Sequence, residues 1–396
     1  MTAALTLDVI LVIALVGFLV SGLRRGLARS LGSMLGLAAG AVAAYFLAPL
    51  LTGIVPWPLW RVFFVVTAAV FLLILGHSIG SAIGRLIGRG VDRTALRPVD
   101  RLLGGAATLV TAALAVSLLA GSVTALGAPV FSRAASESTV ITGIQRLTPD
   151  PVDSALAQLR SLVLADGVPV LGQDIGGVTT APSTAPDVET STDPLVTASA
   201  SVVRITGTAY ACGQNQSGSG FVVSANRIVT NAHVVAGVDQ PVVQAPNGQS
   251  IEGRVVYFDA RDDLAVIATT GLTVPALDLN EPLAPGDESV VQGYPFGGPF
   301  VSGGAEVLAV SSERLRDIYG DSTSEREVYT LAAEINPGNS GGPLLALDGE
   351  VAGVVFAKSA DSSQLGYAMT NTELAPVVDV APELSAAVSS GSCIAE

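Results

Sequence analysis

The sequence predicts an all-α four-helix transmembrane domain followed by an all-β domain. Long apolar stretches fill the first third of the 396-residue chain, and the hydrophobic share of 49% exceeds what a globular core needs. From residue 195 the pattern changes to short β-branched runs such as RIVTNAHVV and DLAVIAT, punctuated by Gly, Asn, Asp and Pro. Many short strands with frequent turns are typical of a barrel or sandwich.

Four apolar stretches are each long enough to cross a hydrocarbon layer of roughly 30 Å as a helix. They cover residues 5–23, 31–51, 62–80 and 102–126. A cleaved signal peptide would account for one stretch near the N-terminus but not for three more behind it. Residues 1–127 are therefore predicted to form a membrane domain.

Glycines recur at every fourth position in the second stretch and at the end of the third. They are Gly32, Gly36 and Gly40, and then Gly76, Gly80, Gly84 and Gly88. On a helix this spacing makes a smooth stripe that another backbone can approach closely, so we expect tight packing or self-association of the membrane helices. A glycine-rich composition without a particular partner is the alternative.

The arginines predict how these helices are oriented. Three lie between the first and second stretches, one between the second and third, and five between the third and fourth: Arg24, Arg25, Arg29; Arg61; Arg85, Arg89, Arg93, Arg97 and Arg101. Because cytoplasmic loops carry an excess of Lys and Arg, both basic loops are expected in the cytoplasm. The N-terminus and everything after residue 126 then lie on the periplasmic side.

The net charge and the few possible metal ligands of the part after residue 127 limit which partners and cofactors it is expected to bind. Residues 1–127 hold nine Arg and three Asp, a balance of +6, so the net charge of −14 leaves −20 for the remainder. We expect no nucleic-acid partner for so acidic a domain. One histidine and two distant thiols do not build a usual metal cage, so no metal or cofactor is predicted.

The two cysteines, Cys212 and Cys393, both belong to the outer part and lie far from any C-x-x-C spacing. In an oxidising compartment a disulfide between them would tie the start of the outer domain to its tail. Two unpaired buried thiols are the alternative.

Residues 128–194 are predicted to be an extracytoplasmic connector and disordered linker. The run PVDSALAQLRSLVLADG predicts one amphipathic helix, whereas GGVTTAPSTAPDVETSTDP, residues 176–194, is rich in Thr, Pro, Ser and acidic residues with little to bury. The all-β domain then covers residues 195–396.

Ser340 lies in NPGNSGGPL, which also satisfies the G-x-S-x-G pattern of an α/β-hydrolase. A serine nucleophile needs an adjacent base, and the base needs a third group to orient it. The chain has two histidines, His77 near the membrane and His233 in TNAHVV. No histidine follows Ser340, so the hydrolase order of serine, acid, histidine fails, and the order histidine, acid, serine indicates a chymotrypsin-like double β-barrel.

Three blocks together resemble HtrA-like, trypsin-fold serine proteases: TNAHVV, DDLAVI and NPGNSGGPL. In that family the catalytic aspartate immediately precedes the LAVI strand, which selects Asp263 over the adjacent Asp262. The resemblance implies that Ser340 attacks the scissile carbonyl, that His233 takes and returns the proton, and that Asp263 orients the imidazole.

The same resemblance implies two further features of the site. Backbone N–H groups of Gly338 and Ser340 should form the oxyanion hole. The strand GVVFAKS and the residues before Gly338 should line the primary pocket, where Glu334 stands at a position suited to a basic P1 side chain. A solvated surface role for Glu334 is the alternative.

Nearly the whole chain resembles a larger family. The four spans, with DVILVIALVGFLVSGLRRG and PVDRLLGG, look like the colicin V production (CvpA-like) family, and their fusion to a trypsin-like domain resembles membrane-anchored acid-resistance serine proteases. That family has a protease-domain disulfide to which Cys212 and Cys393 correspond. About thirty residues follow GYAM, too few for a PDZ domain, so none is expected.

The resemblance implies a membrane-tethered extracytoplasmic serine endopeptidase that hydrolyses envelope proteins, with a role in acid or envelope stress resistance. Two other hypotheses stay open. One is a catalytically silent trypsin-like sensor or scaffold. The other is a protease that regulates small-molecule transport by the membrane domain, for which Asp8 and His77 are the sequence hints.

Overall fold

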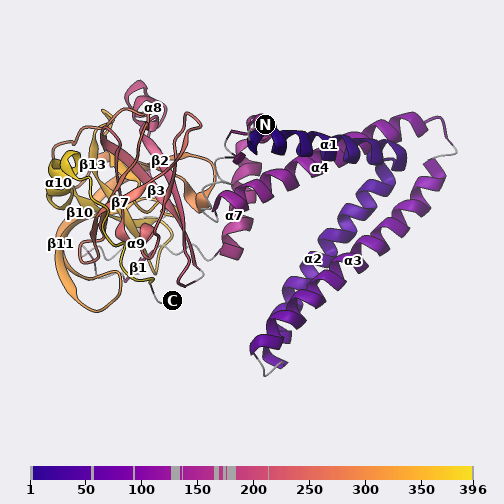
Figure 1. Ribbon diagram of the computed structural model, residues 1–396, viewed down its shortest axis with the longest axis horizontal. Helices are drawn as coiled ribbons and strands as arrows, with labels where there is room; N and C mark the ends of the chain where they lie inside the picture. Colours follow the sequence, from indigo (N-terminus) through magenta and orange to yellow (C-terminus); the bar gives the residue numbers. More distant parts are fainter. Residues whose placement is uncertain are drawn as a thin grey trace. The chain divides into compact units, whose positions relative to one another are not determined.

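A computed structural model describes residues 3–54, 58–91, 94–125, 134–135, 137–164, 169–172, 175, 184–212 and 214–394 (Figure 1). The chain divides into two compact units, formed mainly by Leu5–Ser117 and by Leu118–Glu396. The first unit is helical, and the second holds both β-sheets.

Within the described residues, the first unit is built from four long helices. They are α1 (Ala3–Arg25), α2 (Leu27–Ile54), α3 (Pro58–Val91) and α4 (Arg97–Ala125). Each contains a segment long and apolar enough to span a membrane, which confirms the four predicted membrane helices. Helix α3 continues past the predicted end at Gly80, so Arg85 and Arg89 lie on the helix itself.

The predicted glycine stripe lies where α2 meets α3. A Cβ added to Gly36 would lie 2.9 Å from the Cα of Gly80, and one added to Gly32 would lie 2.9 Å from the Cα of Gly84. Real Cβ atoms do not come so close, so a larger residue would push the two backbones apart. The stripe therefore packs two neighbouring helices of one chain, while self-association between copies stays a prediction.

The described part of the second unit contains short helices around its sheets. They are α6 (Thr139–Leu147), α7 (Asp150–Leu164), α8 (Asp193–Ser199), α9 (Ala232–Val235), η2 (Pro295–Gly297), α10 (Asn371–Val380) and η3 (Ala381–Glu383). Helix α7 is the amphipathic helix predicted from the sequence. Ser138 caps α6, because its Oγ accepts a hydrogen bond from Ile141 N at 3.1 Å.

Part of the predicted linker lies against the β-domain. Residues 176–183 are outside the described residues, but 184–194 are described. Ala185 N donates to Gln364 Oε1 at 2.8 Å, and Val188 is buried in the hydrophobic core. The extent of the disordered linker stays a prediction for the remaining positions.

The strands of the second unit form two seven-stranded sheets over the described residues. Their bounds are β1 (Val170–Leu171), β2 (Val202–Ala209), β3 (Gln214–Ser224), β4 (Arg227–Thr230), β5 (Val242–Gln244), β6 (Ser250–Glu252), β7 (Arg254–Asp259), β8 (Leu264–Ala268), β9 (Glu288–Gly293), β10 (Val301–Arg316), β11 (Thr323–Ala332), β12 (Pro343–Leu345), β13 (Val351–Ser359) and β14 (Leu365–Thr370).

One sheet has the order β6-β5-β2-β3-β4-β8-β7, and the other has the order β1-β13-β12-β9-β10-β11-β14. The second closes on itself through the pairing of β13 with β14, which makes a barrel. Strand β1 joins this barrel from the connector and pairs in parallel with β13. The β-branched runs of the sequence supply the buried strand residues, as expected for an all-β domain.

Candidate active site

The structure brings His233 and Asp263 together through two neighbouring strands. His233 lies in α9, just after β4, and Asp263 directly precedes β8. Strands β4 and β8 pair antiparallel, so the end of one lies beside the start of the other. Ser340 lies just before β12 in the other sheet, and all three side chains are buried.

Asp263 holds His233 at both ring and backbone. Its Oδ2 lies 2.8 Å from His233 Nδ1, and its Oδ1 accepts the His233 backbone N–H at 2.9 Å. Asp263 has φ 56°, the left-handed region that Asp tolerates better than most residues. Asn231 Nδ2 donates to the Asp263 carbonyl at 2.9 Å, a contact that the sequence did not predict. The adjacent Asp262 is half-buried and does not make these contacts with the imidazole.

Ser340 Oγ and His233 Nε2 are both buried and have no hydrogen-bond partner among the described residues, so they are not hydrogen-bonded to each other. The segments that carry them lie close together, because a Cβ added to Gly341 would lie 3.0 Å from Asn231 N. Because Asp263 engages Nδ1, Nε2 is the ring nitrogen left to accept a proton.

The loop before Ser340 depends on glycine and on a buried hydroxyl. Gly338 has φ +94°, which a β-carbon disfavours. Ser219 Oγ donates to the Gly338 carbonyl at 2.7 Å and accepts from Tyr294 N at 2.9 Å, while Ser219 N donates to the Ser340 carbonyl at 2.8 Å. Ser219 therefore fixes the loop that carries Ser340, a role that no sequence motif indicated.

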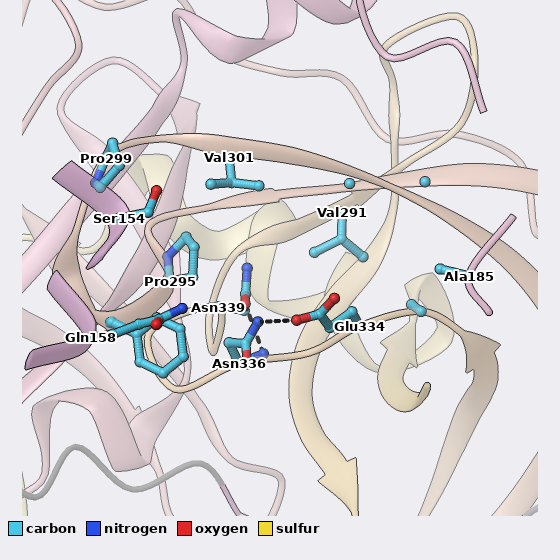
Figure 2. Close-up of a pocket in the computed structure, with 14 residues that line it drawn as sticks. Ser154, Gln158, Ala185, Val291, Pro295, Pro299, Val301, Glu334, Asn336 and Asn339 are labelled. Atoms are coloured by element: carbon cyan, nitrogen blue, oxygen red, sulfur yellow. Dashed lines mark hydrogen bonds between the residues drawn. The ribbon is translucent and has the colours of Figure 1, made fainter. Parts of the chain in front are cut away.

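A cavity of about 290 Å³ lies beside this loop (Figure 2). Strands β9 and β10, η2, α7 and the residues Glu334, Asn336 and Asn339 line it. Glu334 is exposed, and its Oε1 accepts a hydrogen bond from Asn336 Nδ2 at 3.0 Å. Residues before Gly338 line this cavity, whereas no described residue of β13 does, so the predicted primary pocket stays a prediction. The effect of Glu334 on P1 preference stays a prediction.

Two buried groups shape the electrostatics near the site. Burial lowers the pKa of Arg326, and Asp263 is the carboxylate that most opposes this shift. Arg326 Nη2 donates to the Arg316 carbonyl at 2.8 Å, and the Arg326 guanidinium lies 5.6 Å from the centre of the Phe356 ring. Burial also raises the pKa of Tyr294 to about 12, so this phenol stays neutral.

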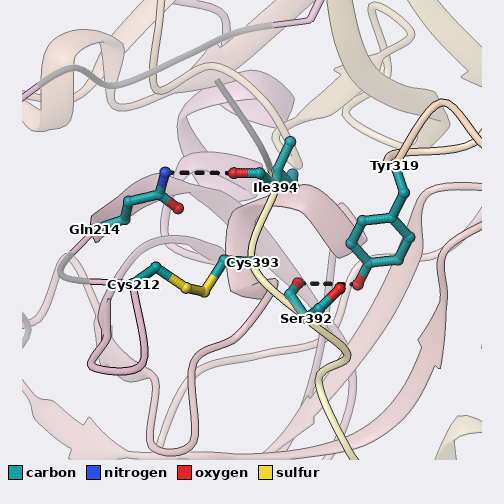
Figure 3. Close-up of a disulfide and its surroundings, with 6 residues drawn as sticks. All are labelled: Cys212, Gln214, Tyr319, Ser392, Cys393 and Ile394. Atoms are coloured by element: carbon teal, nitrogen blue, oxygen red, sulfur yellow. Dashed lines mark hydrogen bonds between the residues drawn. A yellow bond between two sulfur atoms is a disulfide. The ribbon is translucent and has the colours of Figure 1, made fainter.

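Cys212 and Cys393 form the predicted disulfide, with Cα atoms 6.4 Å apart (Figure 3). Hydrogen bonds support the cysteine-bearing tail on both sides: Gln214 Nε2 donates to the Ile394 carbonyl at 3.3 Å, and Tyr319 Oη donates to the Ser392 carbonyl at 3.0 Å. The disulfide thus ties the C-terminal tail to the segment between β2 and β3.

Among the described residues, no group of three His, Cys, Asp or Glu side chains is placed to hold a metal ion. The described residues supply a buried imidazole held by a carboxylate and a buried serine hydroxyl in a glycine-rich loop. Together with the two-sheet fold, this arrangement defines the class of trypsin-like serine peptidases.

Comparisons with known proteins agree with this class. Residues 218–354 match the trypsin-like peptidase domain, and residues 7–149 match the colicin V production protein family. Serine protease Rv3671c of Mycobacterium tuberculosis is 34% identical over 71% of this chain and 71% of its own length. The chain belongs to this family of trypsin-like serine proteases joined to a colicin V production domain, and it is a membrane-anchored serine endopeptidase.

A solved structure supports the fold. The crystal structure of the Rv3671c protease in its active form is 34% identical, with a TM-score of 0.50, and covers 58% of this chain and 95% of that chain. HtrA-like relatives match a smaller share of this chain. A probable periplasmic serine endoprotease DegP-like of Halomonas elongata is 35% identical over 42% of this chain and 35% of its own length.

Proposed function

We propose that this endopeptidase cleaves proteins of the cell envelope, on the periplasmic side of the cytoplasmic membrane, with Ser340, His233 and Asp263 as its catalytic triad. The observation that carries the triad is the contact of Asp263 with His233 Nδ1, which leaves Nε2 as the ring nitrogen for proton transfer. Serine peptidases use this division of roles between the two ring nitrogens.

The reaction follows from these positions. His233 Nε2 takes the proton of Ser340 Oγ as the oxygen forms a bond with the scissile carbonyl carbon. Asp263 stabilises the resulting imidazolium, which then gives its proton to the leaving amine as the peptide C–N bond breaks. Water hydrolyses the acyl-enzyme by the same proton transfers in reverse.

The oxyanion of the tetrahedral intermediate requires donors that are already in place. We assign these donors to the backbone N–H groups of Gly338 and Ser340. The φ of +94° at Gly338 and the hydrogen bond from Ser219 Oγ to its carbonyl support this assignment, because they fix the backbone of the loop. One such donor contributes about 3 to 4 kcal/mol to lowering the barrier in comparable sites.

The periplasmic location rests on the basic loops and on the disulfide. Disulfides persist in oxidising compartments, and Cys212–Cys393 belongs to the protease unit. A role in acid or envelope stress and a contribution of Glu334 to P1 preference belong to the same proposal.

Peptide hydrolysis by the full-length protein in detergent tests the triad. We expect Ser340→Ala to lose at least about a thousandfold in kcat. Ser201→Ala is the matched control, because Ser201 is also buried with an unpaired hydroxyl but lies outside the site. If wild type hydrolyses no peptide or protein, or if Ser340→Ala keeps wild-type activity, the catalytic proposal fails and the silent sensor is favoured.

A further inference from the structure

Helix α7 of the connector packs against η2, the short helix beside the nucleophile loop. Ala157 of α7 is 2% exposed. A Cβ added to Gly298, the residue that follows η2, would lie 2.5 Å from the Ala157 Cβ. Figure 2 shows Ser154 and Gln158 of the same helix beside Pro299 and Pro295. The contact leaves no room for a larger side chain at either position.

The other side of η2 contacts the nucleophile loop. Phe296 N donates to the Pro337 carbonyl at 2.5 Å, and a Cβ added to Gly338 would lie 2.9 Å from Phe296 N. Phe296 has φ 56° and ψ 24°, a left-handed conformation that is costly for a bulky residue. Such a conformation persists only where the surrounding structure holds it.

Two contacts from the protease domain help to hold η2. Arg204 Nη1 donates to the Gly297 carbonyl at 2.7 Å, and Tyr294 N donates to Ser219 Oγ at 2.9 Å. Helix α7 adds a third contact through Ala157 and Gly298. The position of η2 is therefore set partly by the connector and partly by β2 and β3, the strands that carry Arg204 and Ser219.

The geometry of one peptide links η2 to the oxyanion hole. Pro337 C=O and Gly338 N–H belong to the same planar trans peptide, so they point in opposite directions. While Phe296 N holds the carbonyl toward η2, the Gly338 N–H points away from η2. A shift of η2 would let this peptide rotate and would withdraw one oxyanion donor.

We propose that Ala157 is a positioning residue for the protease: α7 holds η2 against the Pro337–Gly338 peptide and so keeps the oxyanion hole formed. This inference rests on the proposed function, because it assigns a catalytic consequence to the Gly338 N–H. It makes full activity depend on the connector helix that follows the membrane domain in sequence. Displacing α7 should lower kcat more than it changes KM, since the oxyanion develops in the transition state.

The first test compares two alanines of the same helix in full-length protein. Ala157→Leu should lower kcat at least about tenfold, and up to the 10²- to 10³-fold that complete loss of one oxyanion donor costs, with little change in KM. Ala155→Leu, at an exposed position, should leave both unchanged. Equal kcat for the two variants, alongside an active wild type and an inactive Ser340→Ala, would overturn the inference and leave the proposed function intact.

A compensating pair keeps the inference testable if Ala157→Leu does not fold. Gly298→Ala should lower kcat, because its new Cβ meets the Ala157 Cβ. Combining it with Ala157→Gly removes that clash, so the double variant should regain most of the lost kcat. If Gly298→Ala keeps wild-type kcat, or if the double variant shows no recovery, α7 does not position the oxyanion hole.

Discussion

The membrane unit and the protease unit both place glycines where backbone meets backbone, but for different reasons. Gly36 in α2 has an ordinary helical conformation, and a Cβ there would lie 2.9 Å from the Gly80 Cα. Gly338 is similarly crowded and also has φ +94°. Size alone requires glycine in the membrane helices, whereas size and conformation together require it in the nucleophile loop.

The helix contact and the active site are specified differently in the sequence. The α2–α3 contact repeats along both helices, so it is visible in the sequence as glycine at every fourth residue. The active site depends on single residues far apart in sequence, each held by a different loop. Single substitutions in the α2–α3 contact should weaken helix packing gradually. Single substitutions in the active site should lower kcat strongly.

The largest effect is expected at the acid of the protease unit. Asp263→Asn should lower kcat by about 10⁴, because the neutral amide no longer stabilises the imidazolium or selects its tautomer. Asp262→Asn should change kcat little, since it does not contact His233. Steady-state hydrolysis by the two variants measures the difference, and similar losses from both would contradict the assignment of Asp263.

The next effect is expected at the glycine of the nucleophile loop. Gly338→Ala combines a strained φ with a clash, so kcat should fall about 10²- to 10³-fold as the oxyanion donor moves. Gly248 has φ +88° but open space around its Cβ position. Gly248→Ala therefore isolates the backbone strain and should keep near-wild-type kcat; an equal loss there would remove the special role of Gly338.

Reduction of the disulfide should destabilise the protease unit by about 2 to 4 kcal/mol, because Cys212–Cys393 closes a long loop of the unfolded chain. Thermal unfolding of the oxidised and reduced protein measures this difference. A Cys212→Ser, Cys393→Ser variant should unfold at the same temperature with and without reductant. Identical melting temperatures for oxidised and reduced wild type would refute the prediction.

The smallest effect is expected in the membrane unit. Gly36→Val should destabilise the α2–α3 packing by about 1 to 3 kcal/mol, as overpacking does elsewhere. Gly17→Val is the matched control, because no heavy atom lies within 4 Å of the Gly17 Cβ position. Cross-linking between cysteines placed on α2 and α3 should weaken with Gly36→Val alone. Equal cross-linking in both variants would mean that the stripe does not pack these helices.

Much of the fold could be predicted from the sequence, because its signals are local. The length of the apolar stretches predicted four membrane helices, and the glycine spacing predicted a close helix contact. The end of α3 was not predicted correctly, because the sequence does not distinguish arginines on a continuing helix, such as Arg85 and Arg89, from arginines in a loop. The two-sheet architecture followed from short strands together with the order of His233 and Ser340.

The site could be predicted only in part. Residue types alone left Asp262 and Asp263 open, and family resemblance selected Asp263; the structure shows that its left-handed backbone turns the carboxylate toward His233. Ser219 was missed because it acts on Gly338 from 119 positions away and through a backbone carbonyl. The contact of α7 with η2 was likewise hidden, because Ala157 and Gly298 lie far apart in sequence and neither carries a functional side chain.

Labelling of the full-length protein with a fluorophosphonate, followed by mass spectrometry of its peptides, tests the proposed roles of Ser340 and His233. The proposed triad predicts one adduct, on Ser340, that is lost in Ser340→Ala and forms far more slowly in His233→Ala. No adduct on folded wild-type protein, or an adduct that forms equally fast without His233, would contradict it.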